Sequence, residues 1–291
     1  MTTVIPQISA LLIAGPTASG KSALAIAEAR RRNGVIINAD SMQVYRELRI
    51  LSARPSEEEV ASVPHLLYGH VSGAENYSVA RWLADVAGAM QVCWEHDQLP
   101  ILCGGTGLYF KAALEGLAEI PPISAEIREK WRRFEGDVHG ELQKHDAAAA
   151  AKLHPADRQR IVRALEVVEA TGHTLGYWKK AGQGRALLNQ INVEKLYLEV
   201  SREELHERAE RRLDLMLQHG ALAEVRNLPA FNADRPIMKA IGVPEFQAHL
   251  RGEISLEKAI EKAKASTRQY IKRQTTWWRG QMPGWSLVKP Q

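Results

Sequence analysis

A glycine loop near the N-terminus has the composition of a phosphate-binding site. Residues 15–22 match the pattern G-x-x-x-x-G-K-[ST] of a P-loop. In such a loop, glycines let backbone N–H groups converge on phosphates, the lysine neutralises charge, and the final hydroxyl can ligate Mg²⁺. We therefore expect a di- or triphosphate to be bound by Gly15, Pro16, Thr17, Ala18, Ser19, Gly20, Lys21 and Ser22, with Ser22 as the metal ligand.

Polar side chains follow two further predicted strands. Asp40 comes shortly after the apolar run 35–37, and Thr106 follows the run 101–103 through two glycines. Because parallel strands end at one edge of a sheet, we expect both side chains near the phosphate loop. A carboxylate there can accept a proton or help hold a metal, and a hydroxyl can bond a phosphate oxygen. The alternatives are structural: Asp40 as a helix N-cap, and Thr106 as the cap of a tight turn.

Strand and helix patterns alternate around these loops. We predict strands over 8–14, 35–37, 101–103 and 196–200, and helices over 21–32 and 78–95. This alternation predicts an α/β fold of the P-loop NTPase type, a parallel sheet with helices on both faces. Residues 119–190 carry helical patterns at 124–134, 147–151 and 157–171, then a glycine-rich stretch around Gly176, Gly182 and Gly184. We thus expect a core domain of 1–118 and 191–291, with C-terminal basic helices, and an all-helical insertion at 119–190.

Charge is concentrated at the C-terminal end. The 291 residues carry a net charge of +4, yet residues 262–291 hold seven basic and no acidic side chains. Such a segment favours a polyanionic partner, nucleic acid or an anionic membrane, or else a solvated helix face. On the predicted helix, Arg268, Lys272 and Arg279 share one face that we expect to point outward. The adjoining face, with Tyr270, Ile271, Gln274, Trp277 and Trp278, should pack on the body.

Other features narrow the class of protein. No apolar run reaches the 18 or so residues that span a bilayer, so we expect no membrane segment. Cys93 and Cys103 form neither a disulfide framework nor a metal motif, which favours the cytoplasm. A GTPase guanine motif, a Walker B aspartate, HExxH and G-x-S-x-G are all missing from the sequence. Two pairs, Arg160 with Arg163 and Arg208 with Arg212, each share a helical face; surface ion pairs or phosphate contacts would both explain them.

Taken in order, these motifs and several others resemble the tRNA dimethylallyltransferase (tRNA isopentenyltransferase) family. Besides residues 15–22, the matching stretches are Asp40-Ser41 with Gln43-Val44-Tyr45, Ala53-Arg54-Pro55, Pro64-His65, residues 104–112, His154-Pro155 with Asp157, residues 159–167 and the C-terminal segment 267–277. The chain departs from the family at Gly242-Val243-Pro244, where an aromatic and a basic residue are usual after the glycine.

The resemblance implies a reaction and a set of site residues. Family members transfer a dimethylallyl group from its diphosphate to N6 of the adenine beside the anticodon, position 37, in tRNA. By resemblance, the P-loop would hold dimethylallyl diphosphate with Mg²⁺, and the catalytic residues would be Asp40 as general base, Thr106 at the bridging oxygen, and Lys21. Contacts to the anticodon stem-loop of tRNA would come from Asp40, Ser41, Met42, Gln43, Thr106, Arg128, Gln159, Arg160, Arg163, Lys239, Arg268, Lys272 and Arg279.

Three other functions remain open at this point. One is an isopentenyltransferase acting on free AMP or ATP, which would have little use for the insertion or the basic tail. The others are a P-loop nucleotide kinase and a non-catalytic RNA-binding protein. We expect a cytoplasmic monomer with tRNA and dimethylallyl diphosphate as partners.

Overall fold

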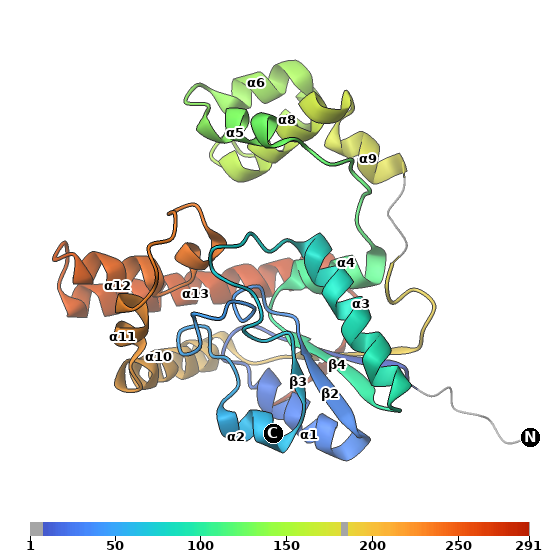
Figure 1. Cartoon of the computed structure of the whole chain (residues 1–291), viewed down its shortest axis with the longest axis vertical. Helices are drawn as coiled ribbons and strands as arrows, with labels where there is room; N and C mark the ends of the chain where they lie inside the picture. The colour runs from blue at the N-terminus through green and yellow to red at the C-terminus, as the bar shows by residue number, and fades with distance from the viewer. Residues whose placement is uncertain (1–7, 182–185, 291) are drawn as a thin grey trace, which may run out of the picture. The chain divides into compact units, whose positions relative to one another are not determined.

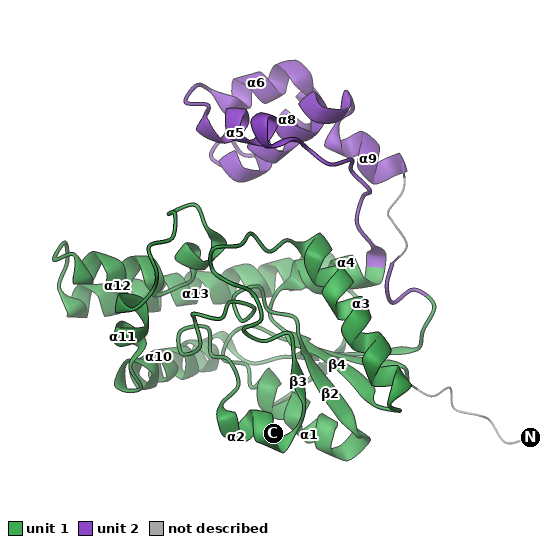
Figure 2. Cartoon of the chain, in the orientation of Figure 1, with its two compact units in different colours: residues 1–114, 190–291 green, residues 115–189 purple. Residues whose placement is uncertain are grey.

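The computed structural model describes residues 8–181 and 186–290, and the chain divides into two compact units (Figure 2). Unit 1 comprises Met1–Leu114 and Gln190–Gln291, and unit 2 comprises Glu115–Asn189. Unit 1 contains the sheet, and unit 2 is helical in its described part.

A six-stranded sheet with strand order β3-β2-β4-β1-β5-β6 organises unit 1 (Figure 1). Every pairing between these strands is parallel. The strands are β1 Ala10–Ala14, β2 Gly34–Asn38, β3 His65–Leu66, β4 Leu99–Gly104, β5 Val193–Leu198 and β6 Ser286–Val288. The predicted parallel α/β fold is therefore confirmed.

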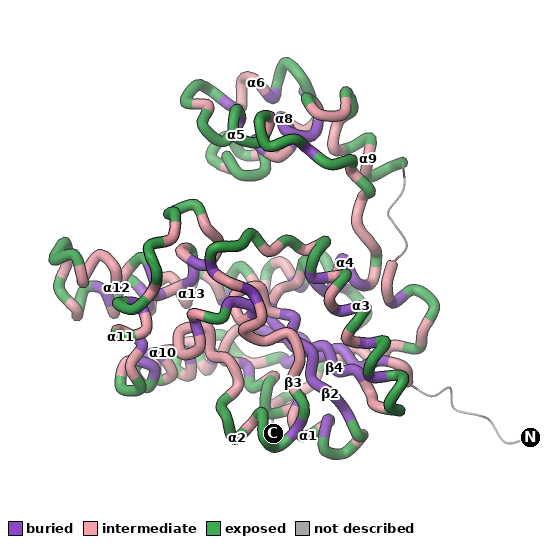
Figure 3. Tube along the Cα trace, viewed as in Figure 1, coloured by how far each residue is buried: buried purple, intermediate pink, exposed green. Residues whose placement is uncertain are grey.

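The central strands are buried because helices cover both faces of the sheet (Figure 3). Leu11, Ile13 and Ile101 pack with Ala25 and Ala29 of α1. Since successive strand residues face opposite sides, the residues between them face the other helical layer, which includes α3. Burying each of these leucines and isoleucines fully stabilises the fold by about 1.5–3 kcal/mol.

Helices connect and extend the sheet. Those of unit 1 are α1 Lys21–Arg32, α2 Glu57–Ser62, α3 Val79–Glu95, α4 Gly107–Glu115, α10 Arg202–Gln218, α11 Ala221–Arg226, η1 Pro236–Lys239, α12 Val243–Leu250 and α13 Leu256–Gln281. Ser78, Ser201 and Ser255 each cap a helix by accepting a backbone N–H of its first turn. Phe246, Leu213 and Tyr45 belong to a second core, which fixes α10, α12 and α13 beside the loop after β2.

Unit 2 has its own hydrophobic core. It contains α5 Ala125–Arg133, α6 Val138–His145, α7 Ala147–Ala150, α8 Arg158–Thr171 and α9 Leu175–Ala181. Trp131, Leu142, Ile161 and Leu165 pack together at its centre. Gly172 ends α8 with a positive φ of 69°, as its position in the sequence predicts.

Three details differ from the sequence-based prediction. Strand β5 covers Val193–Leu198 and not 196–200, because it begins in polar residues such as Glu194 and Lys195 that carry no strand signal. Gly176, from the glycine-rich stretch, lies within helix α9, for which we predict no helical pattern, whereas Gly182 and Gly184 fall outside the described residues. Strands β3 and β6 have two and three residues, too short to show a pattern. Among the described residues, no helix is both long and apolar enough to cross a membrane.

Candidate active site

Three loops meet at the carboxyl edge of the sheet, as the sequence predicts. They follow β1, β2 and β4, which are adjacent in the sheet. The register places Ala14 beside Gly104 and Asn38 beside Cys103, so the three strands end at the same level. The P-loop, Asp40 and Thr106 are therefore brought together by strand order.

The P-loop turns sharply into helix α1. Ser19 donates its N–H to Pro16 O at 3.2 Å, and Gly20 adopts a φ of 90° just before the helix begins at Lys21. The left-handed conformation explains why the pattern requires glycine at position 20. Lys21 Nζ lies 3.4 Å from Pro16 O, so its ammonium folds back under the loop. Burial lowers the pKa of Lys21, Cys103 and Asp40 oppose that shift, and Arg212 adds to it.

Asp40 is held by its own strand end. The buried Asn38 side chain accepts from Asp40 N at 2.8 Å and donates to Asp40 O at 2.9 Å. Asp40 Oδ1 accepts from Met42 N at 2.9 Å, which leaves Oδ2 available for another proton donor. Residues 41–50 form turns and no helix, so the alternative of a helix N-cap is wrong.

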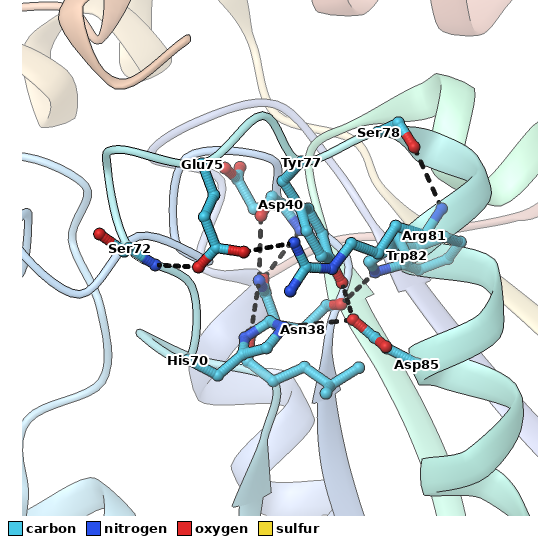
Figure 4. A network of polar contacts seen from close by, with 11 residues as sticks. Asn38, Asp40, His70, Ser72, Glu75, Tyr77, Ser78, Arg81, Trp82 and Asp85 are labelled. Atoms are coloured by element: carbon cyan, nitrogen blue, oxygen red, sulfur yellow. Dashed lines mark hydrogen bonds and ion pairs between the residues drawn. The ribbon is translucent and has the colours of Figure 1, made fainter. Parts of the chain in front are cut away.

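A network of polar contacts connects the end of β2 to helix α3 (Figure 4). Trp82 Nε1 donates to Asn38 O at 2.8 Å, and Tyr77 donates its hydroxyl proton to Asp85 at 2.6 Å. Burial and the hydrogen bond to Asp85 both raise the pKa of Tyr77, so it remains a neutral donor. His70 Nε2 lies 3.5 Å from the same carboxylate. The position of Asp40 thus depends on side chains that do not face the cavity themselves.

Thr106 joins its loop to that of Asp40. Its Oγ1 accepts from Ser41 N at 3.0 Å and lies 3.3 Å from Ser41 Oγ, while its own N–H donates to Ala39 O at 3.2 Å. Thr106 is therefore hydrogen-bonded to both neighbours of Asp40 in the chain, which holds the two loops together.

Two side chains whose place in the site we did not predict reach the P-loop from later helices. Arg212 of α10 donates to Thr17 Oγ1 at 2.5 Å. Burial lowers the pKa of its guanidinium, and the nearby Asp40 carboxylate opposes that shift. Gln274 of α13 accepts from Thr17 N and donates to Gly105 O, both at 2.9 Å. For Arg212 the sequence carries a signal, because no acidic residue lies one helical turn away from it.

A cavity of about 240 Å³ opens between these groups. Polar and charged side chains, among them Thr17, Asp40 and Arg212, line part of it, and apolar ones such as Leu213 and Met216 line the rest. The full lining is Thr17, Asp40, Ser41, Met42, Leu51, Ser52, Ala209, Arg212, Leu213, Met216, Lys239, Ala240, Ile241, Thr267, Tyr270 and Arg273. Such a mixture suits a ligand with an anionic end and an apolar end.

The remaining predicted contact residues of unit 1 have different surroundings. Lys239 is exposed at the cavity wall, and Gln43 donates to Ser52 O and Ala53 O, so its amide shapes the loop. Lys272 and Arg279 are exposed, as predicted for an outward basic face. Arg268 is not free on that face, because it pairs with Glu210 of α10 at 2.5 Å.

In unit 2, the predicted contact residues lie on α5 and at the start of α8. Arg128 and Gln159 are exposed. Arg160 pairs with Asp157 and Arg163 with Glu166, each at 3.4 Å. The Arg160–Asp157 pair is exposed, so it stabilises little and can be exchanged for a phosphate contact. Glu166 is buried, so the Arg163 pair is anchored in the interior of unit 2 at its acidic end. Both arginine side chains still reach the surface. Their role toward tRNA stays a prediction.

Comparisons with known proteins agree with this geometry. The family model described as IPP transferase matches residues 43–281, and that described as isopentenyl transferase matches residues 8–68. A tRNA dimethylallyltransferase of Azorhizobium caulinodans is 54% identical over 288 residues, which cover 97% of this chain and 92% of the relative. One of Nitrobacter hamburgensis is 50% identical, covering 97% and 91%.

Solved structures show the same fold. The tRNA isopentenylpyrophosphate transferase of Bacillus halodurans is 32% identical with a TM-score of 0.70, covering 97% of this chain and 90% of its own. A eukaryotic dimethylallyltransferase acting on tRNA is 28% identical with a TM-score of 0.82, covering 97% of this chain and 74% of its own. The match extends over nearly the whole chain and includes all three loops of the site. The chain therefore belongs to the tRNA dimethylallyltransferase family.

Proposed function

We propose that the protein transfers a dimethylallyl group from dimethylallyl diphosphate to N6 of the adenine at position 37 of tRNA. The observation that carries this proposal is the composition of one cavity. A P-loop threonine, a carboxylate at a strand end and a half-buried arginine line it together with apolar side chains. The apolar wall beside the anionic end suits a five-carbon allylic group attached to a diphosphate.

The diphosphate would lie on the P-loop. Residues 15–22 offer backbone N–H groups and the N-terminus of α1, and Lys21 and Arg212 supply positive charge. Thr106 would add a hydroxyl at the bridging oxygen. These groups stabilise the negative charge that grows on the leaving diphosphate as the allylic C–O bond breaks.

Asp40 would act on the acceptor. The exocyclic amine attacks the allylic carbon, a C–N bond replaces the C–O bond, and the amine proton passes to the Asp40 carboxylate. Oδ2 is the oxygen available for this step, because Oδ1 accepts from Met42 N. A placed base of this kind contributes about 10²–10⁴ in rate. The adenine would have to leave its stack in the tRNA to reach the cavity.

The donor set around the P-loop fits a Mg²⁺ ion shared with the substrate. Ser22 is exposed at the first turn of α1, where its hydroxyl can face a bound diphosphate. Among the described residues, no cluster of three His, Cys, Asp or Glu side chains could hold a metal by itself. Ser22 and the diphosphate oxygens would therefore hold it together, and Mg²⁺ would supply charge neutralisation on the leaving group.

The tRNA would contact both units. Lys239, Lys272 and Arg279 present exposed charge on unit 1, and Arg128, Gln159, Arg160 and Arg163 lie on unit 2. Contacts to phosphates from basic side chains fix the register of an RNA and make its affinity dependent on salt. We also propose that the reaction takes place in the cytoplasm and that one chain forms a complete site.

The test is incubation of the purified protein with Mg²⁺, labelled dimethylallyl diphosphate and unmodified tRNA, with AMP as a parallel acceptor. We expect label in tRNA, mapping to the adenine at position 37. Label in AMP alone would replace the proposal with a free-nucleotide isopentenyltransferase. Label in neither, with phosphate transfer from ATP to a nucleotide, would replace it with a kinase.

A further inference from the structure

Gln274 binds two active-site loops at the same time. Its Oε1 accepts from Thr17 N in the P-loop, and its Nε2 donates to Gly105 O in the loop that carries Thr106. Both bonds are 2.9 Å long, and the partners are 257 and 169 residues away in the chain. One amide group therefore spans the gap between the two loops.

The neighbourhood of Gly105 shows how close this amide is to the reacting groups. A Cβ on Gly105 would collide with Gln274 Nε2, and it would lie 3.4 Å from Gly15 O and 3.5 Å from Asp40 Oδ2. Three residues further along α13, Trp277 packs so closely on Gly107 that a Cβ there would also collide. Helix α13 thus contacts both loops directly at the site, well away from its exposed basic face.

We propose that Gln274 is a positioning residue that fixes the P-loop relative to the 104–107 loop. This inference rests on the proposed function, in which one loop holds the diphosphate and the other lies beside the general base. The attacking nitrogen, the allylic carbon and the leaving oxygen must be aligned across that gap. A displacement of about 1 Å in such an arrangement can cost about 100-fold in rate.

The same hydrogen bonds distinguish Gln274 from the residues of α13 that are predicted to contact tRNA. Lys272 and Arg279 are exposed, whereas both polar atoms of the Gln274 amide are already bonded to protein backbone. The bond from Thr17 also removes that N–H from the donors that the P-loop can offer to phosphate. Each of the two polar atoms of Gln274 is thus engaged by one loop, so the residue acts through the loops.

Three variants test this assignment. Gln274→Met keeps the size of the side chain and removes both hydrogen bonds. Gln274→Glu keeps an acceptor for Thr17 N and loses the donor to Gly105 O. Gln269→Met is the matched control, because Gln269 is exposed on the same helix. For each, we would measure the single-turnover rate constant with both substrates saturating, the Kd for tRNA, and hydrogen exchange of the backbone amides in residues 15–22.

We expect Gln274→Met to lower the single-turnover rate constant by about 30- to 100-fold, while its Kd for tRNA stays within about threefold of wild type. The Thr17 amide should exchange faster in Gln274→Met and stay protected in Gln274→Glu. A weakened Kd for tRNA with an unchanged rate constant would overturn the assignment and make Gln274 an RNA contact. Unchanged exchange of the Thr17 amide in Gln274→Met would overturn it as well. If the wild-type protein does not modify tRNA, the proposed function fails, but the exchange measurement still tests the link between the loops.

Discussion

Replacing Asp40 by asparagine removes one function and preserves the surroundings. Asparagine retains an Oδ1 that can accept from Met42 N, a bond of 2.9 Å in the structure. The bonds from the Asn38 side chain go to the backbone of residue 40, so they do not depend on the side chain there. The fold of the loop should therefore persist, and only the capacity to take a proton is lost.

The expected loss of rate follows from that change. Removal of a placed general base costs about 10²–10⁴ in rate, which corresponds to about 2.7–5.4 kcal/mol in activation free energy. We would follow single-turnover transfer from labelled dimethylallyl diphosphate to tRNA with both substrates saturating, and measure the Kd for tRNA separately. Asp97→Asn is the control, since Asp97 is exposed in a turn with a φ of 53° that asparagine adopts readily.

A rate constant within about threefold of wild type would refute the assignment of Asp40 as the base, because the smallest expected effect is about 100-fold. The assignment would also be refuted if the Kd for tRNA increased while the rate constant at saturation stayed unchanged, because Asp40 would then bind the RNA without taking the proton.

Predictions for Gly104, Lys21 and Arg160 also follow from the structure. Gly104→Ala should lower the free energy of unfolding in urea by about 3 kcal/mol or more, because the new Cβ would collide with the Ala39 backbone. Gly88 is a helical glycine with open space around it, so Gly88→Ala should instead raise the free energy of unfolding by about 0.5–1 kcal/mol. Lys21→Met should raise the melting temperature at pH 7. Burial lowers the pKa of Lys21 in the folded state, so the charged side chain destabilises the fold at neutral pH. This cost disappears as the pH rises toward 10.5, the ordinary pKa of lysine. The same variant should lose the stabilisation, about 2.7 kcal/mol at 100 times Kd, that Mg²⁺ with diphosphate gives the wild type in a thermal scan. Arg160→Ala should change the unfolding free energy by less than about 0.5 kcal/mol, yet reduce the slope of log Kd for tRNA against log salt concentration by about one. Arg133→Ala is the matched control, because it also removes an exposed arginine of unit 2 with a nearby acidic partner, but at a position with no predicted tRNA contact, so its slope should not change.

The parts of the site that could be predicted are those set by local pattern and strand order. The P-loop is contiguous in sequence, and its helix begins at Lys21 as expected. Asp40 and Thr106 were predicted to meet because parallel strands share an edge, and they are joined through Ser41. That rule needs only the identity of the strands and no knowledge of side-chain packing.

Gln274 was harder to place because its position depends on long-range packing. The sequence correctly put it on the face of the C-terminal helix that packs on the body. It could not indicate which part of the body that face would contact. The answer depends on the second core around Phe246 and Leu213, which sets how α13 lies against the sheet. A residue on a packing face therefore looks the same in sequence whether it fills a core or supports a catalytic loop.

Arg208 and Arg212 show what the sequence could have decided. They lie one turn apart on α10, and the same two interpretations, surface ion pairs or phosphate contacts, apply to both. Arg208 has Glu204 one turn before it and pairs with it at 2.5 Å. One turn before Arg212 lies Arg208, which repels it, and one turn after it lies the uncharged Met216. The helix therefore offers Arg212 no acidic partner one turn away. A half-buried guanidinium without a local partner must find one elsewhere, and it does so at Thr17 near the Asp40 carboxylate. The search for distant functional charges on a helix can therefore begin with those that lack an acid one turn away.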